Sequence, residues 1–513
     1  MLRPGAWPQA PGCPVDLVET HISWVFLVDR FAYKVKKPVK LDFLDFSTLA
    51  LRRHFCEEEL RLNRRFAPGL YLGLSRIVAV AGGLAVDVPG KPVEYAVRMQ
   101  RFDRTQELDA LLARGEASPG QLYDFGAKLA LQQEAAPVAG ARQPWADPAR
   151  TLAACRENFA ELRRPGAGGF GPRADRLAAW TEERYPEIAA LLRRRRDAGR
   201  FRECHGDLHC ANVVRHGEEL WAFDALEFDP SLHWIDVAND LAFLYMDLRA
   251  RGHAGLGAAL LDGWLTASGD FGALATLRFY EAYRATVRAK VAAIRMQQSP
   301  GAAAALTNDV DRYLGAAERA TTVPQPLLVA TTGLSGSGKS WLASRLLGPL
   351  DAVRLRSDVE RKRLCGLPET AATGGSIYSG EITRRTYAHL GELAAAALRD
   401  GFSVVVDAAS LRARERQAFR EVAAAAGVPF RLLCVSADPA TLRRRIGERA
   451  AQGGDASEAT VGVLEHQLAA VEPPGADELD DAVCVDTGLP VDPDAVAREL
   501  LRGRCPRLAS RHG

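Results

Sequence analysis

The sequence predicts two domains of different architecture in series: an α+β domain with two lobes, followed by an α/β domain built on a parallel sheet. Three observations support this prediction. The chain has 513 residues, enough for roughly two to four domains. Strand-like runs joined by tight turns fill about the first hundred residues, and helical periodicity then dominates to about residue 296. Beyond residue 326, strand-like and helical stretches alternate, which is typical of a parallel sheet with crossover helices.

The composition excludes several functional classes. The chain carries 66 basic and 64 acidic residues, and this balance argues against a nucleic-acid binder, which is usually strongly basic. No apolar run approaches the ~20 residues of a membrane span, and the start of the chain lacks the basic-then-apolar layout of a signal peptide. Its 9 cysteines suggest reduced thiols. We therefore expect a cytoplasmic protein without a membrane partner, and the oligomeric state stays open.

The first lobe is predicted to be a small sheet with one helix, over residues 15–103. An irregular arm, residues 1–14, precedes it and is rich in proline and glycine. Two short strands joined by a tight turn are expected within 21–37, and helical spacing follows over 50–66. Further strand-like runs lie within 70–102, with a Gly-Gly turn between the first two.

The second lobe, residues 104–300, is rich in Ala, Leu and Arg and has helical periodicity. Two strand-like pieces interrupt it, near 213–215 and 220–224. A stretch rich in Pro, Gly and Ala, residues 301–325, is the expected linker, and its middle could form one helix. The parallel-sheet domain is then expected over 326–513.

The stretch CHGDLHCANVV has the spacing of a protein-kinase catalytic loop. It contains His205, Gly206, Asp207 and Asn212, and Asp224 follows 17 positions after Asp207 at the end of a strand-like run. In such a loop one Asp accepts the proton of the acceptor hydroxyl, while an Asn and a second Asp hold Mg²⁺ against the phosphates. The alternative, a zinc cluster of the neighbouring Cys and His residues, matches no common ligand spacing.

Upstream of this loop, a lysine-rich strand supplies a phosphate-binding candidate. Lys34 and Lys36 share one face of the strand in AYKVKKP, and Lys37 points the other way. Glu59 on the following helix could pair with the strand lysine and hold it towards ATP. Lys34 is the first choice and Lys36 the second; the alternative is a solvated edge strand. Residues 98–102 would form the hinge beside the adenine.

Residues 15–300 resemble the aminoglycoside phosphotransferase-like small-molecule kinases, in particular the branch fused to a P-loop domain. The strings AYKVKKPVKLDFLDFSTL, CHGDLHCANVV and YRATVRAKV carry this resemblance. It implies a two-lobed, protein-kinase-like fold, with Asp207 as catalytic base and Asn212 and Asp224 as metal ligands. There are two departures. No glycine occupies the hairpin at 28–30, and LALQQEAAP at 129–137 has Gln where relatives have His.

GLSGSGKS matches the P-loop pattern G-x-x-x-x-G-K-[ST] in full, after a strand-like run and at the start of a helical one. Backbone N–H groups of such a loop face the phosphates, and the helix N-terminus adds positive potential. The Lys reaches the outer phosphates and the Ser hydroxyl binds Mg²⁺. The expected nucleotide-binding residues are Gly333, Leu334, Ser335, Gly336, Ser337, Gly338, Lys339 and Ser340.

The rest of the second domain resembles P-loop kinases of the zeta-toxin, polynucleotide-kinase and gluconate-kinase kind. Its strand FSVVVDA ends in Asp407 with no following Glu, unlike ring-forming ATPases. We expect Asp407 to be a metal ligand. The resemblance implies that Asp358 activates the acceptor hydroxyl and that Arg445 and Arg449 close on the transferred phosphate. The alternatives are a helix N-cap for Asp358 and a solvated helix face for the arginines.

These motifs predict a bifunctional kinase that uses ATP and Mg²⁺ in each domain to phosphorylate a hydroxyl of a small molecule. One alternative is that the P-loop domain is a nucleic-acid end kinase, although its acidic and basic residues balance. Another is a regulatory ATP-binding protein with a non-catalytic kinase-like half. That reading predicts loss of Asp207, Asn212 or Asp224, and all three are present.

The late helical stretch at 278–295 bears on the acceptor of the first domain. Arg284, Arg288 and Arg295 are spaced to share a helix face, and the stretch offers little acidic surface for a polycationic aminoglycoside. These arginines could bind an anionic metabolite. Alternatively, they pair with nearby acids such as Asp236 or Asp240, or are simply solvated.

Overall fold

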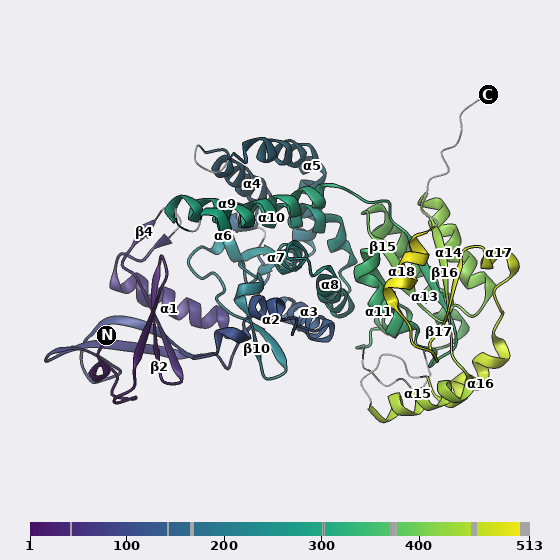
Figure 1. Cartoon of the computed structure of the whole chain (residues 1–513), viewed down its shortest axis with the longest axis horizontal. Helices are drawn as coiled ribbons and strands as arrows, with labels where there is room; N and C mark the ends of the chain where they lie inside the picture. The colour runs from purple at the N-terminus through teal and green to yellow at the C-terminus, as the bar shows by residue number, and fades with distance from the viewer. Residues whose placement is uncertain are drawn as a thin grey trace. The chain divides into compact units, whose positions relative to one another are not determined.

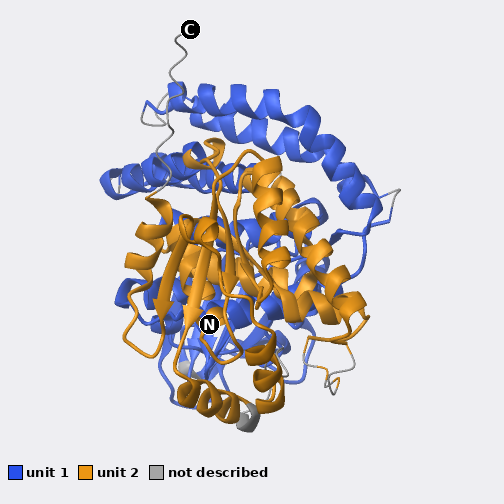
Figure 2. Ribbon diagram, turned by 90° about the vertical axis from the view of Figure 1, so that its right-hand side faces the viewer, with its two compact units in different colours: residues 1–251, 279–318 blue, residues 252–278, 319–513 orange. Residues whose placement is uncertain are grey.

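The computed structural model describes residues 1–502 except 42–43, 141–142, 165–168, 300, 302, 370, 372, 374–376 and 453–458 (Figure 1). The chain divides into two compact units, coloured separately in Figure 2. Unit 1 comprises Met1–Arg251 and Phe279–Glu318, and unit 2 comprises Gly252–Arg278 and Arg319–Gly513. The predicted fold class is confirmed in both units: an antiparallel sheet with helices in unit 1 and a parallel sheet in unit 2.

Unit 1 begins with an antiparallel sheet of six strands in the order β1-β2-β3-β8-β6-β7. The predicted hairpin is β2 and β3, and the later strand-like runs are β6, β7 and β8. The strands are β1 (Val15–Glu19), β2 (Ser23–Val28), β3 (Phe31–Lys36), β6 (Tyr71–Val80), β7 (Gly83–Val86) and β8 (Pro92–Gln100), with β4 (Lys40–Leu41) and β5 (Leu44–Asp45) pairing separately.

The N-terminal arm, residues 1–14, packs on the six-stranded sheet through Trp7. Trp7 is 1% exposed, and its ring lies 4.6 Å from that of Tyr33 and 5.8 Å from that of Phe26. Val15–Glu19 forms β1, which the sequence did not predict. A single buried indole therefore anchors the Pro- and Gly-rich arm, a contact that no periodic pattern indicates.

Helix α1 (Leu49–Asn63) follows the hairpin, close to the predicted span of 50–66. The side chain of Thr48 caps it by accepting a hydrogen bond from the N–H of Leu51. The helix packs against β8 and β6, and its buried residues include Glu59, a charged group at a core position. A carboxylate at such a depth needs a partner, and the site below supplies two.

The larger part of unit 1 is helical, as its periodicity predicts, with two short two-stranded sheets, β10-β11 and β12-β9, on either side of the CHGDLHCAN stretch. The elements are η2 (Arg104–Gln106), α2 (Leu108–Arg114), α3 (Pro119–Glu134), η3 (Pro144–Ala146), α4 (Ala149–Leu162), α5 (Gly171–Asp197), β9 (Phe201–Glu203), η4 (Cys210–Asn212), β10 (Val213–His216), β11 (Glu219–Ala222), α6 (Pro230–His233), β12 (Trp234–Asp236), α7 (Val237–Ala250), α9 (Leu274–Gln298) and α10 (Ala303–Thr321). Helix α9 belongs to unit 1 from Phe279 onward, and α10 belongs to it up to Glu318.

Most of the expected linker is helix α10, and residues up to Glu318 belong to unit 1. The hydroxyl of Tyr313 donates to Asp247 at 2.7 Å from a buried position, and Arg173 of α5 pairs with Glu318 at 2.7 Å. A run of four consecutive exposed residues, 322–325, lies just before the next strand.

Unit 2 is built on a parallel sheet of five strands in the order β14-β15-β13-β16-β17. The strand-like run before the P-loop is β13 and FSVVVDA contains β15, whereas β17 was not predicted. The elements are α8 (Ala254–Ser268), η5 (Phe271–Ala273), β13 (Leu328–Thr332), α11 (Lys339–Leu350), β14 (Ala352–Arg356), α12 (Ser357–Leu364), α13 (Gly380–Arg399), β15 (Ser403–Asp407), α14 (Ala413–Ala425), β16 (Phe430–Ser436), α15 (Pro439–Gln452), α16 (Val461–Ala470), α17 (Ala476–Leu479), β17 (Ala482–Asp486) and α18 (Pro493–Leu501).

The largest difference from the predicted boundaries is residues 252–278, which were expected in the first domain and belong to unit 2. Helix α8 packs on α11 and β14, and Ala258 is part of the apolar core under the parallel sheet. The two helices approach closely enough that a Cβ on Gly348 would lie 2.6 Å from the Cα of Gly255. Glycine at this crossing lets the backbones meet.

Among the described residues, no helix is both long enough and apolar enough to cross a bilayer. The eight cysteines within the described part of the chain are free thiols, and four of them are buried. Small, apolar thiols are common in protein cores, so these residues need no disulfide role.

Candidate active sites

Two lysines on β3 share one face of the first sheet and contact the same carboxylate on α1. Lys34 Nζ lies 2.9 Å from Glu59 Oε1, and Lys36 Nζ lies 2.8 Å from Glu59 Oε2. Strand β3 runs between β2 and β8, so the alternative of a solvated edge strand is wrong. Lys37 points to the other face, as expected, and pairs with Glu19 at 2.6 Å.

The two lysines differ in their second partner. Lys34 Nζ lies 2.5 Å from Asp224 Oδ1, whereas Lys36, only 1% exposed, pairs with Glu227. Burial alone would lower the pKa of Lys34, but the carboxylates of Asp224 and Glu59 outweigh it and hold that pKa well above its usual value. Lys34 is therefore a charged ammonium that borders the site, and Lys36 is enclosed beneath it.

Asp224 occupies a backbone conformation that favours glycine, with φ of 62°. The hydroxyl of Tyr71, on β6, accepts a hydrogen bond from the N–H of Asp224 at 3.0 Å and so stabilises this turn. The conformation directs the carboxylate to Lys34. Strained backbone that the surrounding structure holds in place is common at functional sites.

The loop that carries the CHGDLHCAN stretch is fixed by one buried carboxylate. Asp240 of α7 accepts hydrogen bonds from the N–H groups of His205 and Gly206, at 3.2 and 2.9 Å. Gly206 has φ of 85°, and a Cβ there would lie 2.7 Å from the carbonyl oxygen of Leu232. This explains why glycine replaces the arginine of protein kinases. Gln133, at the unexpected Gln position, donates to Asp240 at 3.2 Å.

Asp207 and Asn212, predicted as base and metal ligand, are brought together in this loop. The Asn212 side-chain nitrogen donates to Asp207 Oδ2 at 3.1 Å and to its carbonyl oxygen at 2.9 Å. Burial raises the pKa of Asp207, but His209 and Arg288 more than offset it, and the pKa stays well below its ordinary value. The group is thus a carboxylate, the form that can accept a proton.

One arginine of α9 has a structural role. Arg284 is 6% exposed; its Nε donates to Asn239 at 2.8 Å and its Nη1 to the carbonyl oxygen of Gly206 at 3.2 Å. The expectation that Arg284 binds a metabolite is therefore wrong, and so is its alternative pairing with Asp236 or Asp240. Asp236 pairs with Arg195 at 2.7 Å.

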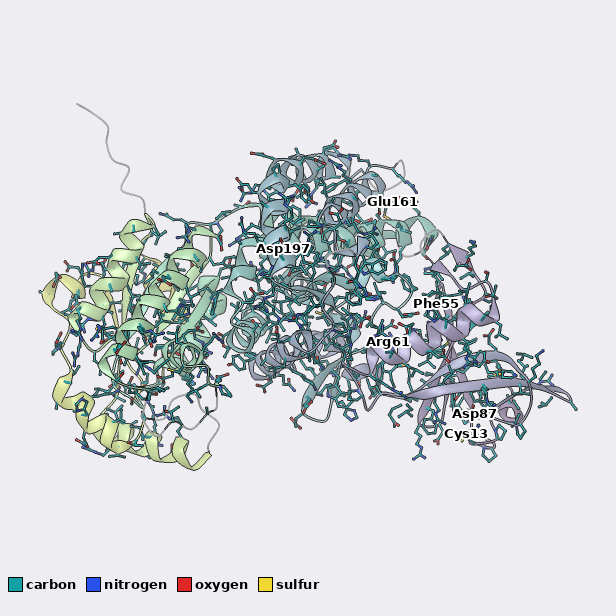
Figure 3. The ribbon with its side chains drawn as sticks, turned by 180° about the vertical axis from the view of Figure 1, so that it is seen from behind. Cys13, Phe55, Arg61, Asp87, Glu161 and Asp197 are labelled. Atoms are coloured by element: carbon teal, nitrogen blue, oxygen red, sulfur yellow. The ribbon has the colours of Figure 1, made fainter. Side chains whose placement is uncertain are left out.

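A further ion pair ties α1 to the strand that leads into this loop. Arg61, labelled in Figure 3, lies 2.7 Å from Glu203 at the end of β9, and Arg65 lies 3.1 Å from the same carboxylate. Glu203 directly precedes the CHGD stretch. The helix that carries Glu59 is thereby connected to the loop that carries Asp207.

In unit 2 the P-loop joins β13 to α11, as predicted. Gly333, Gly336 and Gly338 have φ of 152°, 82° and 87°. A Cβ on Gly333 would lie 2.2 Å from the carbonyl oxygen of Val435, and one on Gly336 would lie 2.8 Å from that of Leu442. Both steric limits and backbone conformation therefore require glycine here.

The polar side chains of the P-loop lie over the end of β15. Ser340 Oγ donates to Asp407 Oδ1 at 3.1 Å, and Lys339 Nζ donates to the carbonyl oxygen of Leu334 at 2.8 Å. Burial lowers the pKa of Lys339 to about 8, although Asp407 acts in the opposite direction. The structure thus brings together the predicted Lys, Ser and Asp.

One P-loop N–H group donates a hydrogen bond to a side chain that the sequence did not predict to lie there. The Ser335 N–H donates to the side-chain oxygen of Gln467, on α16, at 2.8 Å. An amide oxygen therefore occupies a position suited to a phosphate oxygen, which is the group that P-loop N–H groups cradle. No spacing rule links residue 467 to the P-loop, so only the fold reveals this contact.

Asp358 lines the same cleft as the P-loop, in the first turn of α12. The N-cap of that helix is Arg356, without a capping side-chain hydrogen bond, so the N-cap alternative for Asp358 is wrong. The cleft has a volume of about 780 Å³. Its charged lining residues are Lys339, Arg356, Asp358, Arg361, Asp407, Arg412, Glu415, Arg445 and Arg449.

The arginines of α15 fall into two groups. Arg443 and Arg444 are exposed and pair with Glu465 and Glu448, which fits the alternative of a solvated helix face. Arg445 and Arg449 line the cleft instead. Arg445 donates to the hydroxyl and the carbonyl oxygens of Thr487, both at 2.8 Å, and to the carbonyl oxygen of Gly336 at 3.3 Å. Arg449 donates to the carbonyl oxygen of Ala459 at 3.3 Å.

Comparison with known proteins covers both units. Residues 328–474 match the AAA domain family. Among solved structures, a choline/ethanolamine kinase family protein from Mesorhizobium loti is 14% identical, with a TM-score of 0.36 over 62% of this chain and 97% of that chain. A gluconokinase from Sinorhizobium meliloti is 23% identical, with a TM-score of 0.25 over 35% of this chain and 91% of that chain.

Uncharacterized protein Rv2004c of Mycobacterium tuberculosis is 31% identical over 451 residues. This alignment covers 86% of the present chain and 88% of the mycobacterial protein, so it extends through both units. The chain therefore belongs to the same family as Rv2004c, with an AAA-type P-loop domain in its second unit.

Proposed function

We propose that the protein is a bifunctional ATP-dependent phosphotransferase that transfers the γ-phosphate of ATP to a hydroxyl of a small molecule in each unit. One observation carries the proposal: each unit sets a lysine beside a metal-type carboxylate and keeps a second aspartate in the same neighbourhood for the acceptor. In unit 1 Lys34 contacts Asp224, and Asp224 and Asp207 both act electrostatically on His205. In unit 2 Lys339, Asp407 and Asp358 line one cleft.

In unit 1, Lys34 would neutralise the phosphates while Glu59 fixes its position. Asp207, held as a carboxylate, would accept the proton of the acceptor hydroxyl as its oxygen bonds to the γ-phosphorus and ADP departs. Residues 98–102 remain our proposal for the hinge beside the adenine. Lys36 is a supporting residue because it is enclosed between two carboxylates.

In unit 2, the P-loop N–H groups and Lys339 would hold the phosphates of the nucleotide. Asp358 would accept the proton from the acceptor, which enters the cleft on its side of the P-loop. Arg445 and Arg449 would contact the transferred phosphate. Both line the cleft and hold only hydroxyl or carbonyl oxygens in the described contacts, so neither is neutralised by a carboxylate there.

The donor atoms of both sites fit Mg²⁺, which prefers oxygen ligands and retains waters and phosphate oxygens. In unit 1 these atoms are the Asp224 carboxylate and the amide oxygen of Asn212, whose nitrogen is bonded to Asp207. In unit 2 they are the Ser340 hydroxyl and the Asp407 carboxylate, 3.1 Å apart. Mg²⁺, when bound, would offset the negative charge of the phosphates during transfer.

Nucleotide titration tests the number of sites. We expect two ATP equivalents per full-length chain in the presence of Mg²⁺ by isothermal titration calorimetry. Lys339→Ala should remove one and Asp224→Ala the other, because each residue serves its own unit. A single equivalent in the unaltered protein would contradict the proposal of two sites.

Screening a metabolite library for an ATP-dependent mass gain of one phosphate would identify the acceptors. The screen should use the full chain with Lys339→Ala and, separately, with Asp224→Ala, so that each unit acts alone. Balanced charge in the P-loop domain gives no support to an end kinase. Phosphorylation of oligonucleotide ends in preference to every metabolite would nevertheless establish that alternative for unit 2.

The role of Asp207 can be separated from nucleotide binding. Asp207→Asn should lower kcat for the acceptor found by the screen by about 10²–10⁴-fold, since general bases contribute on that order. The Kd for ATP at this site should change by no more than about threefold, because the nucleotide is held by other residues. Equal loss of binding and turnover would show that Asp207 has a different role.

A further inference from the structure

Helix α8 is part of unit 2, although the chain passes through unit 1 both before and after it. It packs on the helix that follows the P-loop and on the edge strand β14. Nine of its residues are buried, and one of them is the carboxylate Asp262. A buried charge on this helix needs a partner within the P-loop unit.

That partner is Arg354, in the middle of β14. Arg354 Nη2 donates to Asp262 Oδ2 at 2.6 Å, and Nε donates to Asp262 Oδ1 at 3.2 Å. The side chains are 6% and 3% exposed. This is a two-pronged arginine–carboxylate contact, the strong form of such a pair, and it is removed from solvent.

The other end of the same guanidinium reaches the metal-type residues of the P-loop site. Arg354 Nη1 donates to the carbonyl oxygen of Ser340 at 3.2 Å and lies 3.7 Å from Asp407 Oδ2. The opposite oxygen of that carboxylate, Oδ1, accepts the hydroxyl hydrogen bond of Ser340. Arg354 thus stands between Asp262 and Asp407, closer to Asp262.

The arrangement of charge decides which carboxylate is neutralised. Arg354 is always a cation, and at this depth it must pair with an anion. Asp262 takes both of the hydrogen bonds that Nε and Nη2 offer and leaves only the longer contact to Asp407. Without the Asp262 charge, Asp407 would be the remaining carboxylate within 4 Å of Arg354 among the described ion pairs, and Arg354 would compete there with a divalent cation.

We propose that Asp262 is a positioning residue for the P-loop metal site: by holding Arg354, it keeps Asp407 available to Mg²⁺. The metal site of unit 2 is therefore incomplete without α8, a segment that lies outside the residues matched to the AAA domain, 328–474. This inference rests on the proposed nucleotide site of unit 2. The inference adds Asp262 to that site, a residue that neither the P-loop pattern nor the order of the motifs indicates.

The test measures how nucleotide binding at unit 2 depends on Mg²⁺. Full-length protein carrying Lys34→Met, which weakens the site of unit 1, is titrated with a fluorescent ATP analogue at increasing Mg²⁺ concentrations. Asp262→Asn keeps the shape of the side chain and removes its charge. It should raise the Mg²⁺ concentration for half-saturation by about tenfold or more, the range seen when partners of metal ligands are lost. The Kd without Mg²⁺ should stay within about twofold, because Lys339 and the P-loop N–H groups are unchanged.

A second variant separates positioning from general stability. Asp262→Asn with Arg354→Gln removes both charges, so no cation is left to compete for Asp407. The Mg²⁺ half-saturation should return to within about threefold of the unaltered value, whereas damage to packing alone would leave it as high as in the single variant or higher. The double variant also avoids an unpaired buried charge, so it remains informative if Asp262→Asn unfolds the unit.

The matched control is Asp481→Asn, the same change at an ion pair with Arg420 and Arg431, just before the strand at the opposite edge of the sheet. It should leave the Mg²⁺ dependence unchanged. Unaltered Mg²⁺ dependence in Asp262→Asn, or no recovery in the double variant, overturns the inference alone. Failure of the unaltered protein to bind the analogue in a Mg²⁺-dependent way overturns the proposed function of unit 2 first.

Discussion

Lys34 and Lys36 stand two positions apart on β3, and burial separates their roles. Lys34 is 14% exposed and contacts Asp224, which is itself half exposed. Lys36 is 1% exposed and is enclosed by Glu59 and Glu227. The pKa of the Glu227 carboxyl is raised, chiefly by burial and also by the neighbouring Glu59 charge, while Lys36 acts against both. Lys36 therefore stabilises a cluster of buried carboxylates on which the position of Lys34 depends.

Substituting each lysine by methionine distinguishes these roles. Lys36→Met leaves two buried carboxylates with one fewer cation, so the free energy of unfolding should fall by about 3–5 kcal/mol. Lys34→Met should cost less than about 2 kcal/mol, since its partner Asp224 can be solvated, but should weaken ATP binding in unit 1. Urea denaturation and calorimetry on the full chain measure the two effects. The reverse pattern would make Lys36 the residue that contacts ATP.

At the scale of elements, glycine decides how closely α8 and α11 approach. A Cβ on Gly348 would meet the backbone of Gly255 at 2.6 Å, a distance that backbone atoms cannot relax easily. Gly391, inside α13, is a matched position where a Cβ would meet only a methyl group of Val422 at 3.5 Å. The same substitution should therefore have opposite effects at the two sites.

Gly348→Ala should destabilise unit 2 by about 1–3 kcal/mol because it overpacks the crossing of α8 with α11. Gly391→Ala should be neutral or stabilise the protein by up to about 1 kcal/mol, since alanine is the better helix former. Thermal unfolding followed by circular dichroism compares them. Equal effects would show that α8 does not pack closely on α11.

The end of α13 gives a pH-dependent prediction. Asp400 is the C-cap residue of this helix, and burial raises its pKa to about 6. Because this pKa lies above the unfolded value near 3.8, the group favours folding below about pH 4 and loses that contribution as the pH rises through about 6. The negative charge is also unfavourable at a helix C-terminus.

Asp400→Asn should therefore stabilise the protein at pH 7.5 by about 1 kcal/mol, a value reduced because the side chain is partly exposed to solvent. At pH 4 most of this gain should be lost, since the carboxyl is then protonated in the folded state and partly protonated in the unfolded state. Denaturation midpoints at the two pH values test this. A gain of the same size at both would mean that the charge of Asp400 is not the cause.

In the whole molecule, neither compact unit is a single continuous segment of the chain. The P-loop unit recruits residues 252–278, and α10 up to Glu318 belongs to unit 1. The predicted linker at 301–325 does lie between the two motifs. Dividing the chain there would nevertheless separate α8 from the core of unit 2, to which it contributes Ala258. Limited proteolysis should first cut at the exposed residues 322–325.

A fragment of residues 326–513 should fold less stably than the same unit within the full chain. It lacks α8, so the apolar surface of α11 that packs around Ala258 would face water, and Arg354 would be left without Asp262. We expect a lower unfolding temperature or aggregation of the fragment, measured by circular dichroism and light scattering. A fragment as stable as unit 2 in the intact protein would mean that α8 contributes nothing.

The fold class, most strands of both sheets and the principal charged residues of both candidate sites could be predicted from the sequence. This was possible because those features are local: strand and helix periods, a Gly-rich loop before a helix, and an H-x-D-x-x-x-x-N spacing. Glu59 was also predictable, since its helix directly follows the lysine strand. The anchoring role of Trp7 and strand β17 were missed because neither produces a distinctive pattern.

Tertiary structure alone decided the contacts that join distant segments. Asp262 and Arg354 are 92 positions apart, Lys36 and Glu227 are 191 apart, and Ser335 and Gln467 are 132 apart. It also gave Arg284 a structural hydrogen bond in place of an expected ligand. The physical reason is the same in each case: a buried charge or an N–H group must find a partner, but which partner it finds depends on how the elements pack.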